Sequence, residues 1–306
     1  MNNRATKIAV LMAVKNGFAY LPQQIDSILN QQHCQVSVFV SDDLSTDGSL
    51  ELLQSYTVRN KNINLLPTGL PSGSSAKNFY RLTTEVETEG FDYIAFSDQD
   101  DIWLPNKLMR HIELAKEHNA DGVSSNVIAF WPDGREFLLE KAQPQQKFDF
   151  LFESAGPGCT YLMTSRLFCK IREQLLDNNS PAKEVAFHDW LAYAICRAYG
   201  YHWFIDSEPS IRYRQHPSNT YGANVGLNAK WLRLRQLKQR WYRDEIIRIA
   251  AVCYKISAEP DIDRLIQVLE KNSLSARLML LGFVPSSRRK LLDRCLLAGA
   301  IVAGVF

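Results

Sequence analysis

The stretch Tyr93-Ile94-Ala95-Phe96-Ser97-Asp98-Gln99-Asp100-Asp101 decides the fold class of this 306-residue chain. It is a short apolar run that stops abruptly at an acidic cluster. The run Ile8 to Val14 is apolar throughout, and residues 36–40 end in the same way, at Ser41-Asp42-Asp43. Runs without polar alternation are typical of parallel strands that are covered on both faces. We therefore expect a buried parallel sheet with acidic groups at the ends of its strands.

Segments with helical periodicity separate these strands. Apolar residues recur every three or four positions in the segments 21–29, 52–56, 76–86 and 108–115, and residues 63–66 and 122–130 are expected to be further strands. This alternation predicts an α/β fold with an open, mostly parallel sheet and helices on both faces. In such sheets ligands bind beyond the carboxyl ends of the strands. The acidic clusters are therefore candidate site residues.

The charges are unevenly distributed along the chain. The total is 35 basic against 33 acidic residues, but residues 1–227 carry 20 basic and 26 acidic side chains, whereas residues 228–306 carry 15 and 7. We expect two parts, an α/β domain at 1–227 and a basic, amphipathic helical region at 228–306. The six cysteines lack paired or zinc-finger spacing and no signal peptide is recognisable, which favours a cytoplasmic protein.

Three carboxylates, Asp98, Asp100 and Asp101, lie within four positions of one another. Such crowding of negative charge is costly unless a cation neutralises it, and carboxylate oxygens suit Mg²⁺ or Mn²⁺. The alternative is a solvated acidic turn that caps the next helix. The chain has no P-loop and no dinucleotide-binding glycine motif, and Gly156-Pro157-Gly158 is too short to be one. A bound nucleotide would therefore need a cation to hold its phosphates.

Two further polar residues stand at expected element ends. Asp189, in Phe187-His188-Asp189-Trp190, precedes a helical pattern. It is either a helix cap or a base that accepts a proton from a hydroxyl. His216 follows a strand that begins near Ser210, and a single loop histidine is more often inert than a ligand.

Five blocks occur together in the order and spacing of family 2 inverting glycosyltransferases, which they resemble over roughly residues 5–222. The blocks are 10–17, 40–47, Ser97-Asp98-Gln99-Asp100-Asp101-Ile102-Trp103, 188–190 and Tyr213-Arg214-Gln215-His216. The third block and the Arg-Gln-His ending are most similar to bacterial rhamnosyltransferases of surface-polysaccharide assembly. The resemblance implies a GT-A fold, a nucleotide diphosphate sugar donor such as dTDP-rhamnose, and a divalent cation, Mg²⁺ or Mn²⁺.

The resemblance also implies roles for the residues that bind the donor. Asp43 would bind the pyrimidine base, and Ala13 and Lys15 would line its pocket. Asp98 would lie near the ribose and the cation. The implied cation ligands are Asp100 and His216.

On the acceptor side, the resemblance implies that Asp189 is the catalytic base, with His188 in place of the commoner Glu. The acceptor, a glycan or a lipid-linked glycan, would meet Trp190 and the loop of Gly156, Gly158 and Thr160, where absent side chains would let a sugar approach the backbone. The alternative for this loop is an ordinary tight turn. Asp189 would deprotonate the acceptor hydroxyl, which would displace the diphosphate in one inverting step.

The basic region adds an expectation about location. Leu227, Trp231, Leu234, Leu237 and Trp241 share one helix face, and basic residues surround it. A second basic run, Arg288-Arg289-Lys290, precedes the apolar tail 296–306. Such a pattern suits an anionic membrane surface, here the cytoplasmic face of the inner membrane, although a helix that packs on the α/β domain is the alternative. No motif indicates nucleic-acid binding.

Two other functional classes fit part of the pattern. A haloacid dehalogenase-type phosphatase also uses an Asp-x-Asp after a strand, but that motif requires Thr or Val two places on, and Ile102 follows Asp101 here. A non-catalytic membrane adaptor could keep the transferase fold without activity. The acidic residues, the candidate base and the histidine are all present, which argues against a transferase that has lost its activity.

Overall fold

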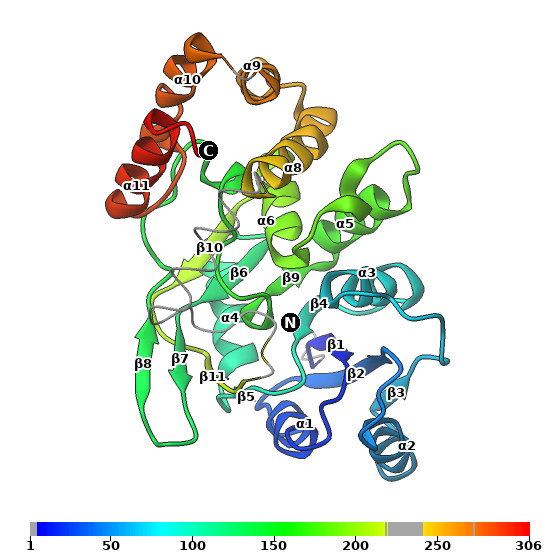
Figure 1. Cartoon of the computed structure of the whole chain (residues 1–306). Helices are drawn as coiled ribbons and strands as arrows, with labels where there is room; N and C mark the ends of the chain where they lie inside the picture. Colours follow the sequence, from blue (N-terminus) through cyan, green and yellow to red (C-terminus); the bar gives the residue numbers. More distant parts are fainter. Residues whose placement is uncertain (1–4, 218, 220–240, 272) are drawn as a thin grey trace.

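The computed structural model describes residues 5–217, 219, 241–271 and 273–306. Its centre is a seven-stranded sheet (Figure 1). In spatial order its strands are β10 (Trp203–Asp206), β6 (Gly122–Ser125), β9 (Leu162–Thr164), β4 (Tyr93–Ser97), β1 (Lys7–Val14), β2 (Gln35–Asp42) and β3 (Ile63–Leu65). β9 runs antiparallel to both of its neighbours, and the other strands are parallel. The predicted α/β class with a mostly parallel sheet is confirmed.

The side chains of β1 alternate between two hydrophobic layers, because successive residues of a strand face opposite sides of the sheet. Ile8, Val10 and Met12 lie in one layer, and Ala9 and Leu11 lie in the other. The first layer is covered by α1 (Leu21–Leu29), α2 (Ser49–Arg59) and α4 (Lys107–Glu117). The second is covered by α3 (Ser75–Glu85), α5 (Ser165–Leu176) and α6 (His188–Ala198). Both faces of the strand are therefore buried from Ile8 onward, which explains why Ile8 to Val14 are all apolar.

A second, four-stranded sheet lies beside the first. Its order is β5 (Ile102–Trp103), β11 (Ile211–Arg214), β7 (Val127–Phe130) and β8 (Glu136–Leu139). The prediction of one strand over residues 122–130 is wrong, because the chain changes sheets at Asn126. The side chain of Asn126 accepts hydrogen bonds from the backbone of Lys141 and Ala142 and donates one to Ser207. These bonds hold the break between β6 and β7.

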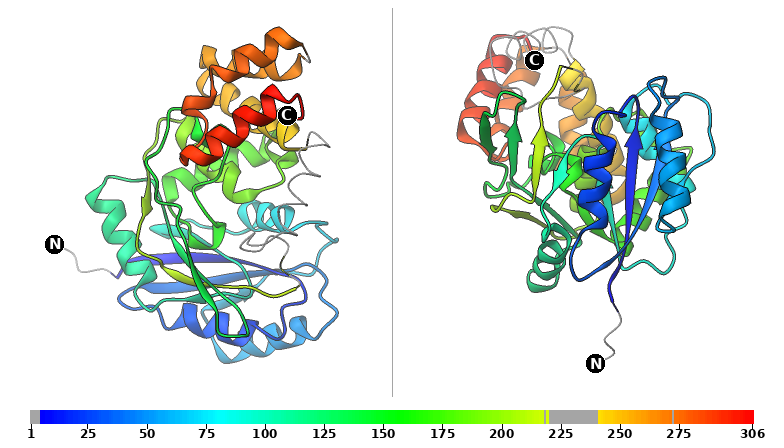
Figure 2. Two further views of the ribbon diagram at one scale, coloured as in Figure 1. Left: turned by 60° about the vertical axis from the view of Figure 1, so that its left-hand side comes forward. Right: turned by 90° about the horizontal axis from the view of Figure 1, so that it is seen from below.

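Four C-terminal helices gather at the end of the molecule opposite α1 and α2 (Figure 2). They are α8 (Trp241–Ser257), α9 (Pro260–Glu270), α10 (Leu274–Leu281) and α11 (Leu291–Val302). Short 3₁₀ turns stand at η1 (Asp149–Leu151), η2 (Gly158–Thr160), η3 (Pro181–Glu184) and η4 (Val284–Ser286). The predicted C-terminal helices are thus present, and their buried faces belong to the same hydrophobic core as α3, α5 and α6.

The structure corrects part of the interpretation of the basic region. Of the predicted amphipathic face, Leu227 to Leu237 lie outside the described residues. Arg243 is buried and donates to backbone carbonyls, and Arg289 is buried in ion pairs. Arg288 is half-buried and pairs with Glu153 and Asp293. These three arginines therefore serve internal contacts and are not free to meet lipid head groups. Among the described residues, no helix combines the length and apolar character that crossing a bilayer requires.

Candidate active site

The carboxyl ends of three adjacent strands bring the predicted donor residues together. Val14, the last residue of β1, pairs with Asp42 of β2, and Met12 pairs with Ser97, the last residue of β4. Lys15, Asp43 and Asp98 follow these strands directly. They consequently lie along one edge of the central sheet, where ligands bind in folds of this class.

Asp43 and Lys15 form a polar corner at this edge. The Lys15 Nζ atom lies 2.7 Å from the Asp43 carbonyl oxygen and 3.4 Å from its Oδ2 atom, and the Ser72 amide donates to Asp43 Oδ1 at 2.5 Å. Partial burial opposes ionisation, but the hydrogen bonds from Ser72 and the Lys15 charge hold the pKa of Asp43 below its ordinary value. Asp43 is therefore an ionised acceptor. Ala13, one residue before the end of β1, is buried and pairs with Ser41, two residues before Asp43.

Gln99, which the motif analysis assigned no role, holds Lys15 in place. Its Oε1 atom accepts from the Lys15 amide at 2.7 Å, and its Nε2 atom donates to the Lys15 carbonyl at 3.0 Å. A Cβ atom on Gly17 would lie 2.6 Å from Gln99 Oε1, so the glycine leaves room for this amide. Gln99 thereby joins the loop after β4 to the loop after β1.

The acidic loop is held from the side by the residues that follow β11. Asp100 Oδ2 lies 2.7 Å from His216 Nε2, and the His216 ring stacks on Tyr20 with centroids 4.6 Å apart. The Arg214 amide donates to Asp101 Oδ1 at 3.1 Å, and its Nε atom donates to the Asp100 carbonyl at 2.7 Å. His216 is therefore part of the acidic site, although a single loop histidine by itself carried little weight in the sequence.

The donor atoms of this loop suit a hard divalent cation. Ligand atoms of Asp98, Asp101 and Cys159 lie within 4.8 Å of one another, and Asp101 Oδ2 is buried without a hydrogen-bond partner among the described residues. Burial, followed by the charge of Asp100, raises the pKa of both Asp98 and Asp101. Burial also raises the pKa of Cys159 well above its ordinary value, so it remains a thiol. The carboxylates of Asp98 and Asp101 thus suit Mg²⁺ or Mn²⁺, and the thiol does not. Asp100 and His216, the ligands that the resemblance implies, are outside this group of three and are paired with each other.

Asp189 stands in the first turn of α6, where the helix dipole favours a carboxylate. The Trp190 amide donates to its Oδ1 atom at 2.7 Å. Burial raises its pKa to about 6, against the hydrogen bond from Trp190 and the positive charge of Lys141. The charge of Asp189 in turn raises the pKa of Asp98. The candidate base and the donor-side carboxylate are therefore close enough to interact.

His188 has a packing role in the structure. Its ring stacks on Phe79 with centroids 3.8 Å apart, and burial lowers its pKa to about 3. A Cβ atom on Gly158 would lie 2.5 Å from His188 Nε2 and 3.1 Å from Asp189 Cβ. Gly158 thus allows the 3₁₀ turn η2 to pass directly against the residues at the start of α6. Because the half-buried His188 ring is neutral and packed on Phe79, acid–base chemistry here falls to Asp189.

The acceptor-side predictions divide into two groups. Gly158 is packed against Asp189, and Gly156, with φ of +124°, lies against Lys141; both glycines are buried. Thr160 is fully buried and its Oγ1 atom donates to the Pro157 carbonyl at 2.7 Å, while the buried Trp190 donates from Nε1 to the Phe150 carbonyl at 2.8 Å. Both side chains are therefore engaged in supporting the loop, and their place on the acceptor side stays a prediction.

An ion network from the C-terminal region supports the same loop, and no local sequence pattern predicts it. Arg289 donates from Nη1 to Asp149 Oδ2 at 3.1 Å and from Nη2 to the Ser154 carbonyl at 2.6 Å. Asp149 also accepts from Tyr193 and, at 3.0 Å, from Arg197. Since Tyr193 and Arg197 follow Asp189 on α6, the network links the helix of the candidate base to the segment that leads to Gly156.

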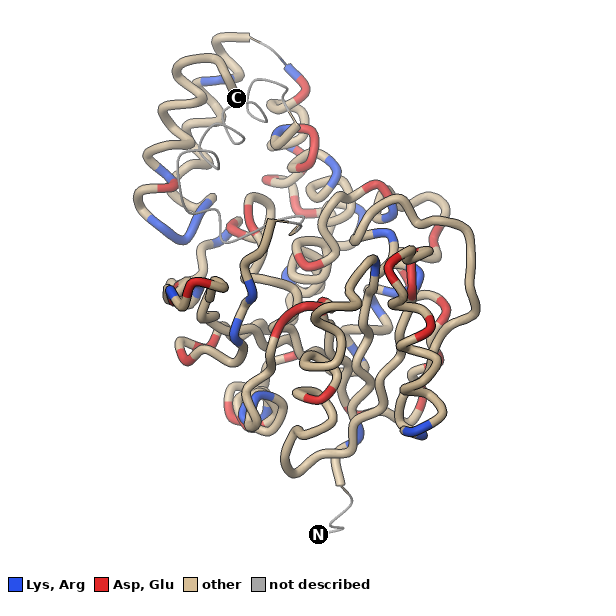
Figure 3. Tube along the Cα trace, turned by 60° about the horizontal axis from the view of Figure 1, so that its bottom comes forward, with Lys and Arg blue, Asp and Glu red and all other residues tan. Residues whose placement is uncertain are grey.

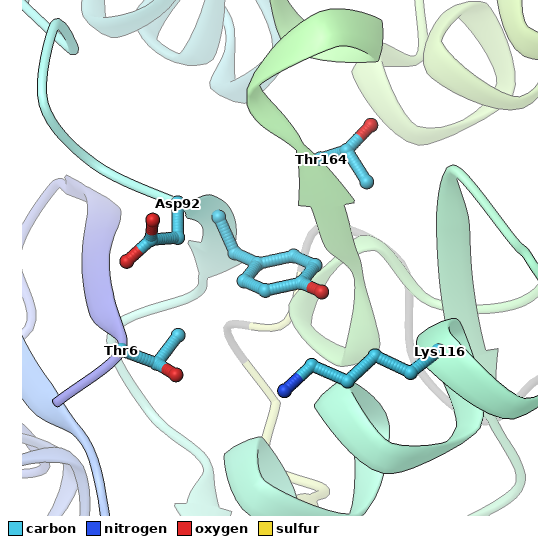
Figure 4. Close-up of a pocket in the computed structure, with 5 residues that line it drawn as sticks. Thr6, Asp92, Lys116 and Thr164 are labelled. Carbon is cyan, nitrogen blue, oxygen red and sulfur yellow. The ribbon is translucent and has the colours of Figure 1, made fainter. Parts of the chain in front are cut away.

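A separate surface hollow of about 390 Å³ lies at the other end of the sheet (Figure 4). Thr6, Asp92, Lys116 and Thr164 line it, and Asp92 accepts from the Lys7 amide at 2.8 Å. Thr6 and Asp92 precede β1 and β4, so the hollow faces the amino ends of these strands. It is therefore distinct from the acidic site at their carboxyl ends.

Comparison with known proteins agrees with this geometry. The model of the family described as glycosyl transferase family 2 matches residues 9–173, which is more than half of the chain. The chain belongs to the family 2 glycosyltransferases. This glycosyltransferase is 42% identical over 240 residues to dTDP-rhamnosyl transferase RfbG of Shigella flexneri, a match that covers 78% of this chain and 83% of that protein. It is 28% identical over 176 residues to the putative teichuronic acid biosynthesis glycosyltransferase TuaG of Bacillus subtilis, covering 54% and 65%.

Solved structures share the fold of this glycosyltransferase. Staphylococcus aureus TarS 1–349 in complex with UDP-GlcNAc superposes with a TM-score of 0.59 at 16% identity and covers 98% of this chain and 82% of that one. The mannosyltransferase PcManGT from Pyrobaculum calidifontis, in complex with GDP-Man and Mn²⁺, gives 0.52 at 15% identity, covering 97% and 85%. The predicted GT-A fold is confirmed, and neither the phosphatase nor the non-catalytic adaptor interpretation is retained.

Gly158→Ala tests the close packing at the candidate base. The added methyl group overlaps His188 and displaces Asp189, and a misplacement of about 1 Å lowers turnover by about a hundredfold. Steady-state sugar transfer measures the effect. Gly299→Ala, whose new methyl group meets no atom within 4 Å, is the matched control and keeps wild-type turnover. Equal rates for the two variants would show that the approach of η2 to α6 is not critical.

Arg289→Met tests the ion network. Removing the guanidinium leaves the buried Asp149 carboxylate with one positive partner fewer. The free energy of unfolding therefore falls by about 3 kcal/mol. Chemical denaturation measures the loss. Lys290→Met, at the neighbouring exposed cation, changes stability by less than about 0.5 kcal/mol. An Arg289→Met variant as stable as the Lys290→Met variant would contradict the role given to the network.

Proposed function

We propose that this enzyme transfers rhamnose, with inversion, from dTDP-rhamnose to a hydroxyl group of a glycan or lipid-linked glycan during cell-surface polysaccharide synthesis. The observation that carries the proposal is the position of Asp189, a half-buried carboxylate of raised pKa that interacts with Asp98 and is packed against Gly158. The choice of donor is supported by the 42% identity to a dTDP-rhamnosyl transferase.

On the donor side, the ionised Asp43 accepts hydrogen bonds from the pyrimidine base. Lys15 and Ala13 line the same corner, and Gln99 fixes the backbone of Lys15 so that the pocket keeps its shape. Asp98 faces the ribose. Together these groups orient the nucleotide at the carboxyl ends of β1, β2 and β4.

A divalent cation, Mg²⁺ or Mn²⁺, is the proposed cofactor, and Asp100 and His216 are the proposed ligands, with Asp98 beside them. When bound, it supplies positive charge that stabilises the departing diphosphate. The unpartnered Asp101 Oδ2 atom and the mutual repulsion of the three carboxylates support this assignment. Arg214 holds the backbone of the acidic loop whether or not the cation is bound.

On the acceptor side, Asp189 accepts the proton of the attacking hydroxyl. Gly156 and Gly158 offer backbone without side chains, which lets a sugar approach. Lys141 lies against Gly156, and its charge lowers the pKa of Asp189. The hydroxyl oxygen then attacks the anomeric carbon from the face opposite the diphosphate, and one displacement inverts the configuration.

We also propose a division of labour along the chain, with residues 1–227 as the catalytic domain and residues 228–306 as the region that holds the enzyme at the cytoplasmic face of the inner membrane. Its partner there is an anionic lipid surface, and nucleic acid is not a proposed ligand. The excess of basic residues in 228–306 supports this assignment.

Asp189→Asn tests the base directly. An amide cannot accept the acceptor proton, so turnover falls by about a hundredfold or more, while dTDP-rhamnose still binds. Transfer assays and calorimetric titration of the donor measure the two properties. Asp133→Asn, at an exposed carboxylate in the turn between β7 and β8, is the control and keeps full turnover. Normal transfer by the Asp189→Asn variant would remove Asp189 from the role of base.

The pH profile gives an independent test. Because Asp189 acts in its ionised form and burial raises its pKa to about 6, kcat/KM falls as the pH is lowered through about 6. Lys141→Met removes a charge that favours the carboxylate and so moves this limb to higher pH. The fall of kcat/KM at low pH belongs to another group if its midpoint does not move in the Lys141→Met variant. The same conclusion holds if this fall remains in the residual activity of the Asp189→Asn variant.

A further inference from the structure

The solvent-facing sides of α10 and α11 are apolar. Sixteen large hydrophobic side chains are exposed in the described part of the chain, and half of them lie in its last 33 residues. These eight are Leu274, Leu278, Met279, Leu291, Leu292, Leu296, Val302 and Val305. Apolar surface on this scale is uncommon on a protein that meets only water, and it marks an interaction surface.

Helical geometry gathers these residues on one side of each helix. At about 100° per residue, the exposed residues of α11 fall within an arc of about 140°. They are Leu291, Leu292, Cys295, Leu296, Gly299 and Val302, and none is charged. The opposite side buries Leu297 and Ile301 in the core. α10 repeats the pattern, with Leu274, Ser275, Leu278 and Met279 outside and Ala276 and Leu280 inside. Each helix thus has one apolar side for the core and a second one that the core does not use.

The surrounding charge favours an anionic partner. Residues 271–306 contain six basic side chains and one acidic side chain, Asp293. Asp293 and Arg288 pair with each other, whereas Lys271 and Lys290 are exposed next to the first residues of α10 and α11. Figure 3 shows both helices as almost uncharged tubes with basic residues at the end where α11 begins. An uncharged apolar face flanked by cations is the pattern of a helix that lies in the interface of an anionic bilayer.

We propose that α10 and α11 form a membrane-contact face, which inserts its leucines into the head-group boundary of an anionic bilayer while Lys271 and Lys290 meet the phosphates. The length of the two helices agrees with lying in the interface, since neither can span a bilayer.

This face is coupled to the catalytic centre. Arg289, two residues before α11, donates to the Ser154 carbonyl, and Ser154 precedes the loop at Gly156 and Gly158. Docking of the face therefore brings the acceptor side of the site to the membrane, where the sugar of a lipid-linked acceptor stands. The face gives residues to the membrane role proposed above for residues 228–306, and it rests on that part of the proposed function; the choice of acceptor rests on the proposed sugar transfer.

Flotation of the full chain with vesicles tests the face. The chain floats with phosphatidylcholine vesicles that contain phosphatidylglycerol and binds phosphatidylcholine alone more weakly. Leu292→Gln/Leu296→Gln replaces two exposed leucines and lowers the vesicle partition coefficient by at least about tenfold. Val58→Gln/Leu176→Gln, at exposed positions on α2 and α5, is the matched control and floats as the wild type does. All four side chains are exposed, so thermal unfolding is unchanged.

Three outcomes would overturn the proposal. Two of them are flotation results: a wild-type chain that fails to float, and a Leu292→Gln/Leu296→Gln variant that floats like the control. The third is a sedimentation result showing that these leucines instead hold two copies of the chain together. The variant keeps normal transfer to a lipid-free glycan acceptor, since neither leucine belongs to the catalytic site. Failure of the wild type to use dTDP-rhamnose would contradict the proposed function while leaving the flotation result unaffected.

Discussion

Confinement of three carboxylates to a buried loop is the constraint on which the rest of the site depends. Asp98, Asp100 and Asp101 follow β4 within four residues, and burial together with their mutual repulsion raises the pKa of Asp98 and Asp101. Proteins bury like charges together only where a compensating group is present. Here Arg214 and His216, which the second sheet brings to the loop through β11, hold it by hydrogen bonds, and the proposed cation would compensate its charge.

The same constraint explains the features that surround the loop. Gln99 ties it to the end of β1, so the pocket of Asp43 and Lys15 is fixed to the acidic centre. On the other side, Asp189 is near enough for its charge to disfavour ionisation of Asp98. Donor and acceptor residues therefore share one electrostatic environment. A change in the charge of Asp98 or of Asp189 alters the pKa of the other carboxylate.

Local patterns predicted much of this arrangement. The apolar run of β1 identified a doubly covered strand, and the acidic residues after β2 and β4 identified the edge of the sheet that carries the site. The resemblance then placed Asp189 and His216. What the sequence could not show depends on long-range packing. Thr160 and Trp190 look like polar contacts in the sequence, but the structure engages them in supporting the loop.

In the C-terminal region, too, long-range contacts are not visible in the sequence. The run Arg288-Arg289-Lys290 is basic in sequence, but two of its members pair with Asp149 and Glu153, more than a hundred residues earlier. No local pattern could identify these partners. The apolar tail 296–306 was visible in the sequence, but a helix with two apolar faces has a weak periodicity, and only the fold shows which faces of α10 and α11 the core uses.

The most direct test of the account is the binding of Mn²⁺, followed by electron paramagnetic resonance in the presence of dTDP. The account predicts one bound ion per chain in the wild type, retained in the Asp189→Asn variant and lost or strongly weakened in Asp100→Asn and His216→Ala. Unchanged Mn²⁺ binding in Asp100→Asn, or no bound ion in the wild type, would contradict the claim that the acidic loop is completed by a divalent cation.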